Sequence, residues 1–437
     1  MNNVKLTIDK LDDDLAGVCY QGAQRYVVDG ALPKETVLVE PIQTVGTVTL
    51  ARLRKVLVPS PDRVQADCAI YHRCGGCDLR HASEAAEAEY KTALLRRKLS
   101  QVDKSVAVSP LKSVAGLRNK VSWAFGEADG RVTLGFFDPD TKEVVDCWNC
   151  PAHGRWYTPL HSVIRAWGFH SGNKVYDPRW GKGVLRFAVA RRLTGGLMVT
   201  IVATKEPKGL DELYTQLAKL SEHVSLWLNV NDRKTNEVFS RDFRHIAGDK
   251  RLHGSMLGVE FDLSPDSFFQ TNTQVATEIY RDVAARLEGA PHVVDLYSGI
   301  GITSALLAKG GARVDSVEYN GDAVSDAKAL ARLNGVEDLV SVHRGKVQDV
   351  LPTLGDLSSA SVLADPPRAG LGEAVCRSLL DAKPREIVYI SCNPLTLAKD
   401  IAILSDGFSI DLVQPYNMFP RTKHVETLVL LRRRFED

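Results

Sequence analysis

The sequence contains no apolar run long enough to cross a bilayer and no signal-peptide pattern after Met1. It also contains no internal repeats or low-complexity tracts, which excludes a solenoid or an extended linker protein. Lysines and arginines almost balance the acids, at a net charge of +1, so overall charge indicates no partner. We therefore expect a cytoplasmic globular protein without a membrane partner, and its 437 residues suggest two or three domains.

Disulfides are not expected from the eight cysteines, because cytosolic thiols stay reduced. Three of the cysteines instead have a metal-ligand spacing, Cys68-x5-Cys74-Gly-Gly-Cys77. A tetrahedral zinc ion or an iron–sulfur cluster needs a fourth ligand, for which Cys147 and Cys150 are the nearby choices. The spacing alone does not separate these two metals, and unrelated buried thiols are the alternative.

Basic character is concentrated between residues 151 and 200, where eight lysines and arginines face a single acid, Asp177. The same stretch is rich in aromatic residues: Trp156, Tyr157, Trp167, Phe169, Tyr176, Trp180 and Phe187. Cations interleaved with aromatic rings suit a polyanion with exposed bases, and therefore RNA. The alternative is a solvated basic face over an aromatic core.

Three segments differ in pattern. Residues 1–56 form short alternating runs separated by turn residues, which predicts a small β-barrel of the oligonucleotide-binding kind. Residues 57–262 contain the cysteines, a helix over 83–99, strands near 121–125 and 197–202, and a helix over 210–220, which indicates an α+β central domain. Residues 263–437 begin with an amphipathic helix over 275–287 and then alternate strands with helices.

The alternation in this last segment predicts a doubly wound α/β domain. We expect helices over 303–309 and 322–334, and strands over 292–297, 313–318, 339–343, 361–364, 386–390, 408–414 and 425–431. Ligands of such sheets bind outside the carboxyl ends of the strands, so the residues that follow each strand are the candidates for chemistry.

The first strand of that domain ends in a glycine-containing turn, with Gly299 and Gly301. Glycine lets the backbone approach a ligand closely. Glu318 ends the next strand 19 residues after Gly299, where an acid suits the two hydroxyls of a ribose. The third glycine of the dinucleotide pattern is missing, which argues against NAD and favours a single nucleoside such as S-adenosylmethionine.

Three further strand ends carry reactive groups. Asp365 is followed by Pro366 and Pro367, which stiffen the loop. Cys392 follows a β-branched strand and is a candidate nucleophile, although an inert core cysteine is the alternative. Glu426 opens the final strand and could act as a general base in the same crevice.

Together, the motifs Asp-Leu-Tyr-Ser-Gly-Ile-Gly, Asp-Pro-Pro-Arg-Ala-Gly, Ser-Cys-Asn-Pro and His-Val-Glu-Thr resemble the RNA uracil-5-methyltransferase family, and most closely its bacterial 23S ribosomal RNA branch. The resemblance covers nearly the whole chain. It implies a class I methyltransferase domain at 263–437, a TRAM-like N-terminal domain, and an iron–sulfur and RNA-binding domain between them. It implies that Cys392 is the nucleophile, that Glu426 is the base, and that S-adenosylmethionine is the cofactor.

The same resemblance implies the remaining ligand contacts. S-adenosylmethionine would be bound by Gln270, Tyr297, Glu318 and Asp365. A [4Fe-4S] cluster would be held by Cys68, Cys74, Cys77 and Cys150, because Cys150 precedes Pro151 as in the family pattern and Cys147 does not fit it.

Three hypotheses remain open. The first is formation of 5-methyluridine in ribosomal RNA by a monomeric enzyme, and the second is the same reaction on the T-loop uridine of transfer RNA. The third is a non-catalytic iron–sulfur RNA-binding factor, against which the joint presence of Cys392, Glu426, Asp365 and Glu318 argues.

Overall fold

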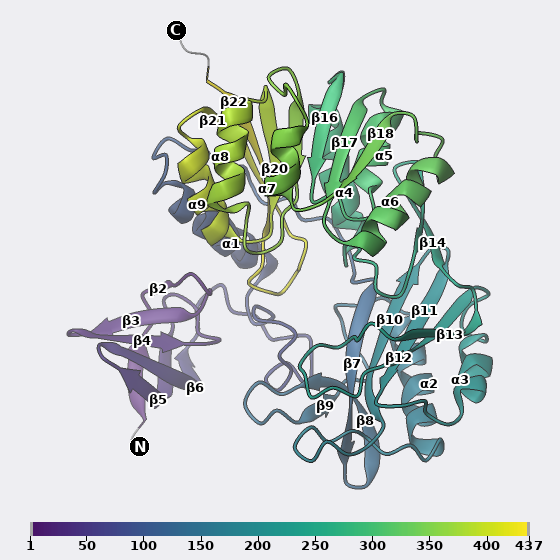
Figure 1. The fold of residues 1–437 in the computed structure, drawn as a ribbon. Coiled ribbons are helices and arrows are strands. Elements are labelled where there is room, and N and C mark those ends of the chain that lie inside the picture. Colours follow the sequence, from purple (N-terminus) through teal and green to yellow (C-terminus); the bar gives the residue numbers. More distant parts are fainter. Residues whose placement is uncertain (1–2, 435–437) are drawn as a thin grey trace.

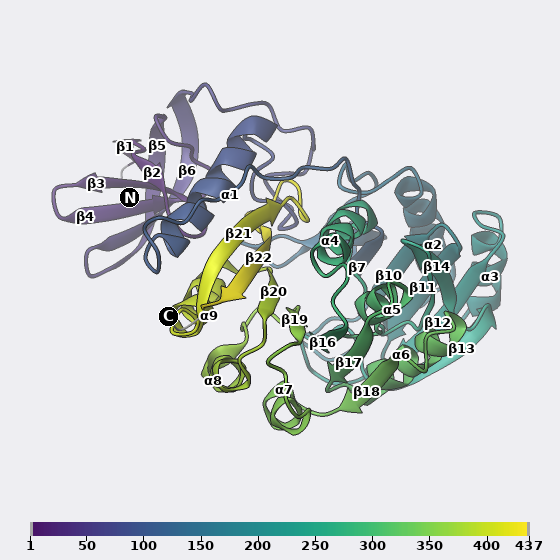
Figure 2. The same ribbon diagram turned by 90° about the horizontal axis from the view of Figure 1, so that it is seen from above.

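The computed structural model describes residues 3–434, so the first two residues of the predicted barrel and the last three of the predicted methyltransferase segment lie outside the described part. Three β-sheets and one separate hairpin make up the strands of that part. Figures 1 and 2 show an N-terminal sheet, a central sheet with helices on one side, and a C-terminal sheet with helices on both faces. No helix within residues 3–434 is long and apolar enough to span a membrane.

The N-terminal sheet has six strands in the order β1-β5-β6-β4-β3-β2. Alternation of apolar and polar residues places Leu6, Ile8, Val37 and Val39 in one small core. The strands are β1 (Val4–Thr7), β2 (Lys10–Leu11), β3 (Gly17–Gln21), β4 (Gln24–Val28), β5 (Thr36–Val45) and β6 (Val48–Val58).

Helix α1 (Glu84–Leu99) leads away from this sheet to the C-terminal one (Figure 2). Ser83 caps it as predicted, since its hydroxyl accepts a hydrogen bond from the Ala86 N–H at 3.2 Å. Leu95 and Leu99 are fully buried in the hydrophobic core of the C-terminal sheet. An N-terminal helix is therefore part of the packing of the C-terminal domain.

The central sheet has the order β13-β12-β11-β10-β7-β8-β9. Helices α2 and α3 pack on one face through apolar residues such as Trp123, Tyr157 and Leu213. The elements are β7 (Lys120–Ala128), β8 (Arg131–Phe137), β9 (Val144–Asp146), α2 (Tyr157–His170), β10 (Leu185–Leu193), β11 (Gly196–Ala203), α3 (Leu210–Leu217), β12 (Val224–Val230) and β13 (Phe243–Gly248). Helix α3 ends three residues before the predicted bound, because Leu220 N–H bonds to the Leu217 carbonyl and tightens the last turn.

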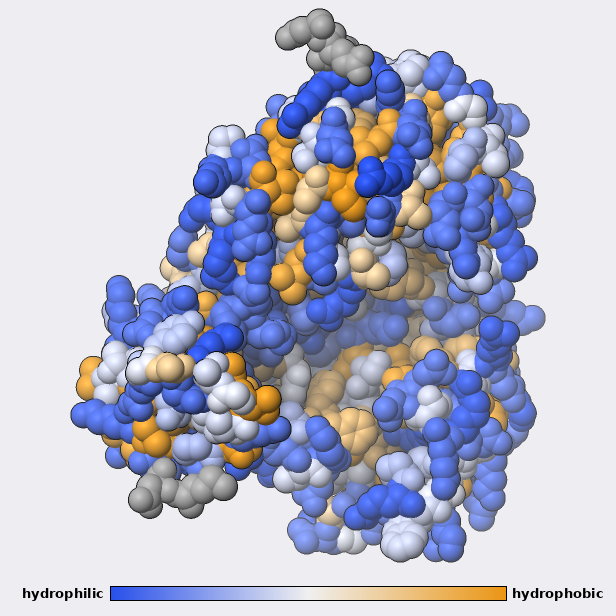
Figure 3. All heavy atoms as spheres, turned by 60° about the vertical axis from the view of Figure 1, so that its left-hand side comes forward, coloured by the Kyte–Doolittle hydropathy of each residue, from blue (hydrophilic) through white to orange (hydrophobic). Residues whose placement is uncertain are grey.

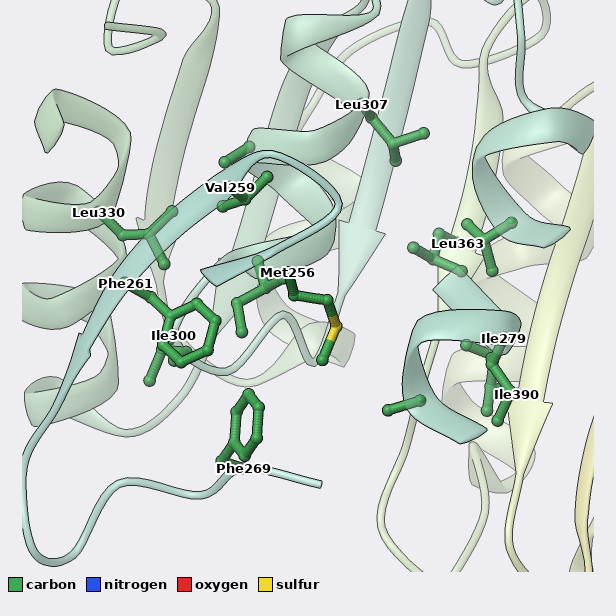
Figure 4. Packing of buried hydrophobic residues seen from close by; sticks show 14 of the residues in the cluster. Met256, Val259, Phe261, Phe269, Ile279, Ile300, Leu307, Leu330, Leu363 and Ile390 are labelled. Carbon is green, nitrogen blue, oxygen red and sulfur yellow. The ribbon is translucent and has the colours of Figure 1, made fainter. Parts of the chain in front are cut away.

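A short hairpin, β14 (Leu252–Met256) and β15 (Val259–Leu263), joins the central sheet to helix α4 (Thr273–Arg286). Its apolar side chains enter the core of the C-terminal domain. Figure 4 shows Met256 and Phe261 from this hairpin packed near Phe269 and Ile300. The rings of Phe261 and Phe269 are 5.0 Å apart between centroids.

The C-terminal sheet has the order β18-β17-β16-β19-β20-β22-β21 and is parallel except where β22 pairs with β20 and β21. It is the doubly wound α/β sheet predicted from the sequence. The elements are β16 (His292–Leu296), α5 (Ile302–Lys309), β17 (Arg313–Glu318), α6 (Gly321–Leu333), β18 (Val340–Arg344), α7 (Val347–Val350), the 3₁₀ helix η1 (Leu351–Thr353), β19 (Ser361–Ala364), α8 (Gly372–Ala382), β20 (Glu386–Ser391), α9 (Pro394–Leu404), β21 (Phe408–Tyr416) and β22 (Glu426–Arg433).

Candidate active site

The turn after β16 has an unusual backbone. Gly299 and Gly301 have φ values of 57° and 84°, and Tyr297, which is not a glycine, has a φ of 61°. A bulky residue in the left-handed region is strained, and such strain gathers at ligand sites. A Cβ on Gly301 would also lie 3.2 Å from the Cβ of Ala327, so the glycine allows α5 and α6 to approach closely.

Glu318, at the end of β17, is tied to this turn. Its Oε2 accepts a hydrogen bond from the Gly299 N–H at 3.0 Å, and its Oε1 accepts one from the Asn320 N–H at 2.6 Å. Two backbone amides therefore fix the carboxylate at the carboxyl edge of the sheet. The structure brings Glu318 and the glycine turn together, as expected for neighbouring parallel strands.

Buried carboxylates gather next to this turn without a cation beside them. Thr303 and Ser304 donate their hydroxyls to Asp295 at 2.7 and 2.6 Å, and burial raises the pKa of Asp295 to about 6. Burial, and then the charge of Asp295, raise the pKa of Asp365 to about 7. Burial, and then the charge of Asp365, raise the pKa of Glu426 well above its usual range. A positive charge brought near these acids would favour their ionised forms.

Cys392 lies near the same carboxylates. Burial, and then the charges of Glu426 and Asp365, raise the pKa of its thiol to about 11 against the opposing charge of Arg368. Electrostatic interactions therefore connect four side chains, those of Asp295, Asp365, Cys392 and Glu426. In the ligand-free protein the thiol is protonated at neutral pH, so Cys392 requires activation before it can act as a nucleophile.

Gln270 reaches this group from the segment before α4. Asn119 holds its backbone, because the Asn119 Nδ2 donates to the Gln270 carbonyl at 2.9 Å. The Gln270 side chain also lowers the pKa of the Tyr280 hydroxyl through a hydrogen bond, although burial and Asp365 raise that pKa more strongly. Tyr280 is thus a member of the crevice that the sequence did not reveal. Tyr280 lies within the regular helix α4, and only its contacts with residues far away in the sequence distinguish it from other residues of that helix.

The four predicted cluster cysteines lie in one neighbourhood. Burial, and then charges on Cys77, Cys150 and Cys68, raise the pKa of Cys74 to about 11. Cys147 is buried in the core of the central domain. A set of four thiols has the donor chemistry of an iron–sulfur cluster. Within residues 3–434, however, no three histidine, cysteine or acidic side chains converge closely enough to hold a metal ion.

The basic aromatic stretch divides into two parts. Tyr157 and Trp167 pack into the core under α2, whereas Trp180 and Phe169 are 73% and 53% exposed. Arg191 is buried over the ring of Phe269, 6.0 Å from its centroid, and its Nε and Nη1 have no hydrogen-bond partner. Part of the stretch is therefore an aromatic core, and RNA binding by its exposed residues stays a prediction.

Residues 187–434 match the family model described as tRNA (Uracil-5-)-methyltransferase, which is more than half of the chain. The chain belongs to this family of RNA uracil-5-methyltransferases. An uncharacterized RNA methyltransferase of Listeria monocytogenes is 32% identical over 441 residues, with 98% of this chain and 97% of that protein covered. One from Halalkalibacterium halodurans is 32% identical over 443 residues, covering 98% of this chain and 96% of that protein.

This RNA methyltransferase is also similar to a solved structure along nearly its full length. The tRNA (uracil-54, C5)-methyltransferase of Pyrococcus abyssi, in complex with S-adenosyl-L-homocysteine, superposes with a TM-score of 0.81 at 27% identity. The match covers 98% of this chain and 100% of that one. The family and this complex support S-adenosylmethionine as the cofactor of the chain.

Proposed function

We propose that this methyltransferase transfers a methyl group to C5 of a uridine in 23S ribosomal RNA and forms 5-methyluridine through a covalent intermediate. The observation that carries the proposal is that Cys392, Glu426 and Asp365 lie close enough to influence one another's protonation. A nucleophile and a base close together match the needs of an unreactive ring carbon.

In the first step, the Cys392 thiolate bonds to C6 of the uracil ring, and the electrons of the C5–C6 double bond move to C5. The carbanion at C5 then takes the methyl group, as the bond from that methyl to the sulfonium of the donor breaks and the donor sulfur leaves as a neutral thioether. The carboxylate of Glu426 next removes the C5 proton. The electron pair of the broken C5–H bond restores the C5–C6 double bond as the C6–sulfur bond breaks. The thiolate of Cys392 is thereby regenerated, so that protons and electrons balance over the cycle.

S-adenosylmethionine supplies the methyl group on a positively charged sulfur. We propose that Gln270, Tyr297, Glu318 and Asp365 hold it, with Glu318 on the ribose hydroxyls. A cation near Asp365 would lower the raised pKa values of Cys392 and Glu426, since opposite charge favours their ionised forms. The nucleophile and the base would then become active only when the cofactor is in place.

For the RNA, we propose contacts from the predicted barrel (1–56) and from the central domain (57–262), with methyl transfer in 263–437. Figure 3 shows a hollow where these three parts meet. Phe268 is 72% exposed on the segment next to Gln270, where a base could stack. The buried Arg191 lies over the neighbouring Phe269 and donates its Nη2 to the Ser267 carbonyl at 2.9 Å, so it helps to hold this segment in place. We propose that the protein acts as a monomer in the cytoplasm.

Transfer RNA is the second candidate substrate. The similarity to the Pyrococcus abyssi enzyme extends over nearly the whole chain, which favours a T-loop uridine. The four cysteines and the N-terminal barrel favour ribosomal RNA through the family resemblance. The two substrates require the same residues at the reacting ring.

Tritium release distinguishes these substrates. Ribosomal and transfer RNAs labelled with [5-³H]uridine are incubated separately with enzyme and S-adenosylmethionine. Release from ribosomal RNA alone is the expected result, because methylation replaces the C5 hydrogen. Release from transfer RNA alone would select the second candidate, and release from neither would contradict uracil-C5 chemistry on these RNAs.

We further propose that Cys68, Cys74, Cys77 and Cys150 hold a [4Fe-4S] cluster. The support is the clustering of their charges around Cys74 and the hydrogen bond that the Arg80 Nε donates to the Cys77 sulfur at 3.3 Å. After anaerobic purification we expect stoichiometric iron and sulfide and a broad visible absorbance. A colourless protein with stoichiometric zinc would overturn the iron assignment.

A further inference from the structure

Glu426 is preceded by a loop, residues 417–425, that connects β21 to β22. Only this loop and the pairing of β22 determine where the Glu426 carboxylate lies. The loop has no regular structure of its own. Its position must therefore be imposed by the residues around it, and the most heavily bonded of these lie on α1.

Lys91 and Glu87 of α1 form a buried ion pair at this loop. The Lys91 ammonium lies 2.8 Å from Glu87 Oε1 and also donates to the Asn417 Oδ1 at 2.8 Å and to the Phe419 carbonyl at 3.2 Å. Glu87 Oε1 accepts in addition from the Asn417 Nδ2 at 3.1 Å and from the Arg421 N–H at 2.9 Å. One helix thus holds the loop at three of its residues.

A contribution to stability alone explains this pair poorly. Lys91 is 0% exposed and Glu87 is 1% exposed. Removing two such charges from water costs several kcal/mol per ion, and well-packed apolar residues often replace a buried ion pair without loss of stability. An apolar pair could not, however, donate hydrogen bonds to the loop backbone or accept hydrogen bonds from it. The polar groups therefore serve to orient the loop.

Further contacts hold the loop from other directions, including bonds from the Arg421 side chain to the Ala82 carbonyl and to Glu84. The N–H groups of Asp78 and Leu79 both donate to the Arg421 carbonyl at 2.9 Å. Asn272, which caps α4, donates its Nδ2 to the Met418 carbonyl at 3.4 Å. The loop is thus fixed between α1, the cysteine segment and the segment that carries Gln270. These contacts restrict the loop, but they do not replace the hydrogen bonds that Glu87 and Lys91 form with it.

We propose that Glu87 and Lys91 are positioning residues, which hold the 417–425 loop so that Glu426 reaches the C5 proton of the bound uridine. The proposal rests on the proposed function and adds two residues that touch neither RNA nor cofactor. It places part of the machinery for proton removal on an N-terminal helix. Cys392 has no hydrogen-bonding connection to this pair among the described residues.

This separation gives the proposal a specific signature. If Glu426 is displaced, Cys392 still adds to C6 and C5 still takes the methyl group, but proton removal slows. The methylated RNA then stays bonded to the protein, and a denaturing gel detects it as a covalent adduct. A protein that is only less stable would show less adduct and less turnover together.

The test variant is the double substitution Glu87→Gln with Lys91→Met, which leaves neither buried charge without its partner. We expect kcat to fall about tenfold or more, since small displacements of catalytic groups have such effects. We expect the KM for RNA to stay within about twofold, because no RNA contact changes, and the adduct fraction to rise several-fold. Glu426→Gln serves as the positive control for adduct accumulation.

Arg96→Met is the matched control on the same helix. Its guanidinium is exposed and lies 3.8 Å from an exposed carboxylate, that of Glu89, so we expect wild-type kinetics. Asn417→Ala provides a second variant that removes the loop side of the contact and leaves the α1 pair intact. It should show the same accumulation of adduct even if the double variant does not fold.

The proposal is wrong if the double variant or Asn417→Ala behaves like Arg96→Met. It is also wrong if kcat falls in both without an increase in adduct. Failure of the proposed function would look different, because the wild-type protein would then release no tritium and Glu426→Gln would trap no RNA.

Discussion

The loops that carry Cys392 and Glu426 face one crevice but are held in different ways. The Cys392 loop is fixed from within its own domain, since the Asn393 Nδ2 and the Thr396 hydroxyl donate to the Arg368 carbonyl at 3.0 and 3.2 Å. The side chain of Asn393 also caps α9 by accepting from the Leu395 N–H at 3.1 Å. All of these partners lie within 28 positions of one another in the sequence.

The loop before Glu426 depends on residues from the other half of the chain. Lys91 and Asn417 are 326 positions apart, and Glu87 and Arg421 are 334 apart. The proposed nucleophile is therefore positioned by local structure and the proposed base by tertiary structure. If these roles are right, addition to C6 and removal of the C5 proton can be disrupted independently.

The largest effect should come from Cys392→Ala. We expect turnover to fall at least about 10³-fold, because removal of a covalent nucleophile eliminates the reaction path itself. RNA affinity should change little, and no adduct should form, in contrast to Glu426→Gln. Tritium release, filter binding and a denaturing gel measure the three quantities. Unchanged methyl transfer would remove Cys392 from the mechanism.

An intermediate effect should come from Arg368→Gln, which alters only the Cys392 side of the comparison. The Arg368 charge lowers the pKa of the Cys392 thiol, so its loss should raise that pKa. Since the thiolate is the reactive form, the rising limb of kcat/KM against pH should move to higher pH, and activity near neutral pH should fall several-fold. A pH profile with the same limb in both proteins would contradict this expectation.

The smallest effect concerns stability on the Glu426 side. The folded-state pKa of Glu426 is raised, so its protonated form is favoured, and the associated stability is lost as pH rises through that pKa. The amide that replaces this carboxyl in Glu426→Gln cannot ionise. The melting temperature of the ligand-free variant should therefore exceed that of the wild type by an amount that grows by about a few degrees as the pH rises from 4.5, the ordinary pKa of this side chain, through its raised value. If the difference in melting temperature between the two proteins were constant across this range, the Glu426 carboxylate would not be a buried charge in the folded protein.

Most of the fold follows from local pattern. Ser83 and the apolar spacing predicted α1 and α4 within two residues of their starts, and the bounds of β17 and β19 agree with the prediction. Helices α8 and α9 were not predicted, although a doubly wound sheet requires helices after β19 and β20. The hairpin β14–β15 was not predicted either, although the apolar Val259, Phe261 and Leu263 of β15 alternate with acids as a half-buried strand requires.

The site divides in the same way. Cys392, Asp365 and Glu426 were predicted because each follows or opens a strand with a distinctive motif, and the structure brings them close enough to interact electrostatically. Tyr280 and Lys91 were not, since each occupies an ordinary position of an amphipathic or mixed helix. Their roles arise from contacts with residues far away in the sequence, which no local pattern encodes.

The place of β22 within its sheet has a consequence for synthesis. It is translated after all the other described elements, yet it is inserted between β20 and β21 rather than added at an edge. Until Glu426 and the residues after it have left the ribosome, β20 has an unpaired side that can join other strands. A chain interrupted before β22 would therefore lack the proposed base and would also expose a strand edge that favours aggregation.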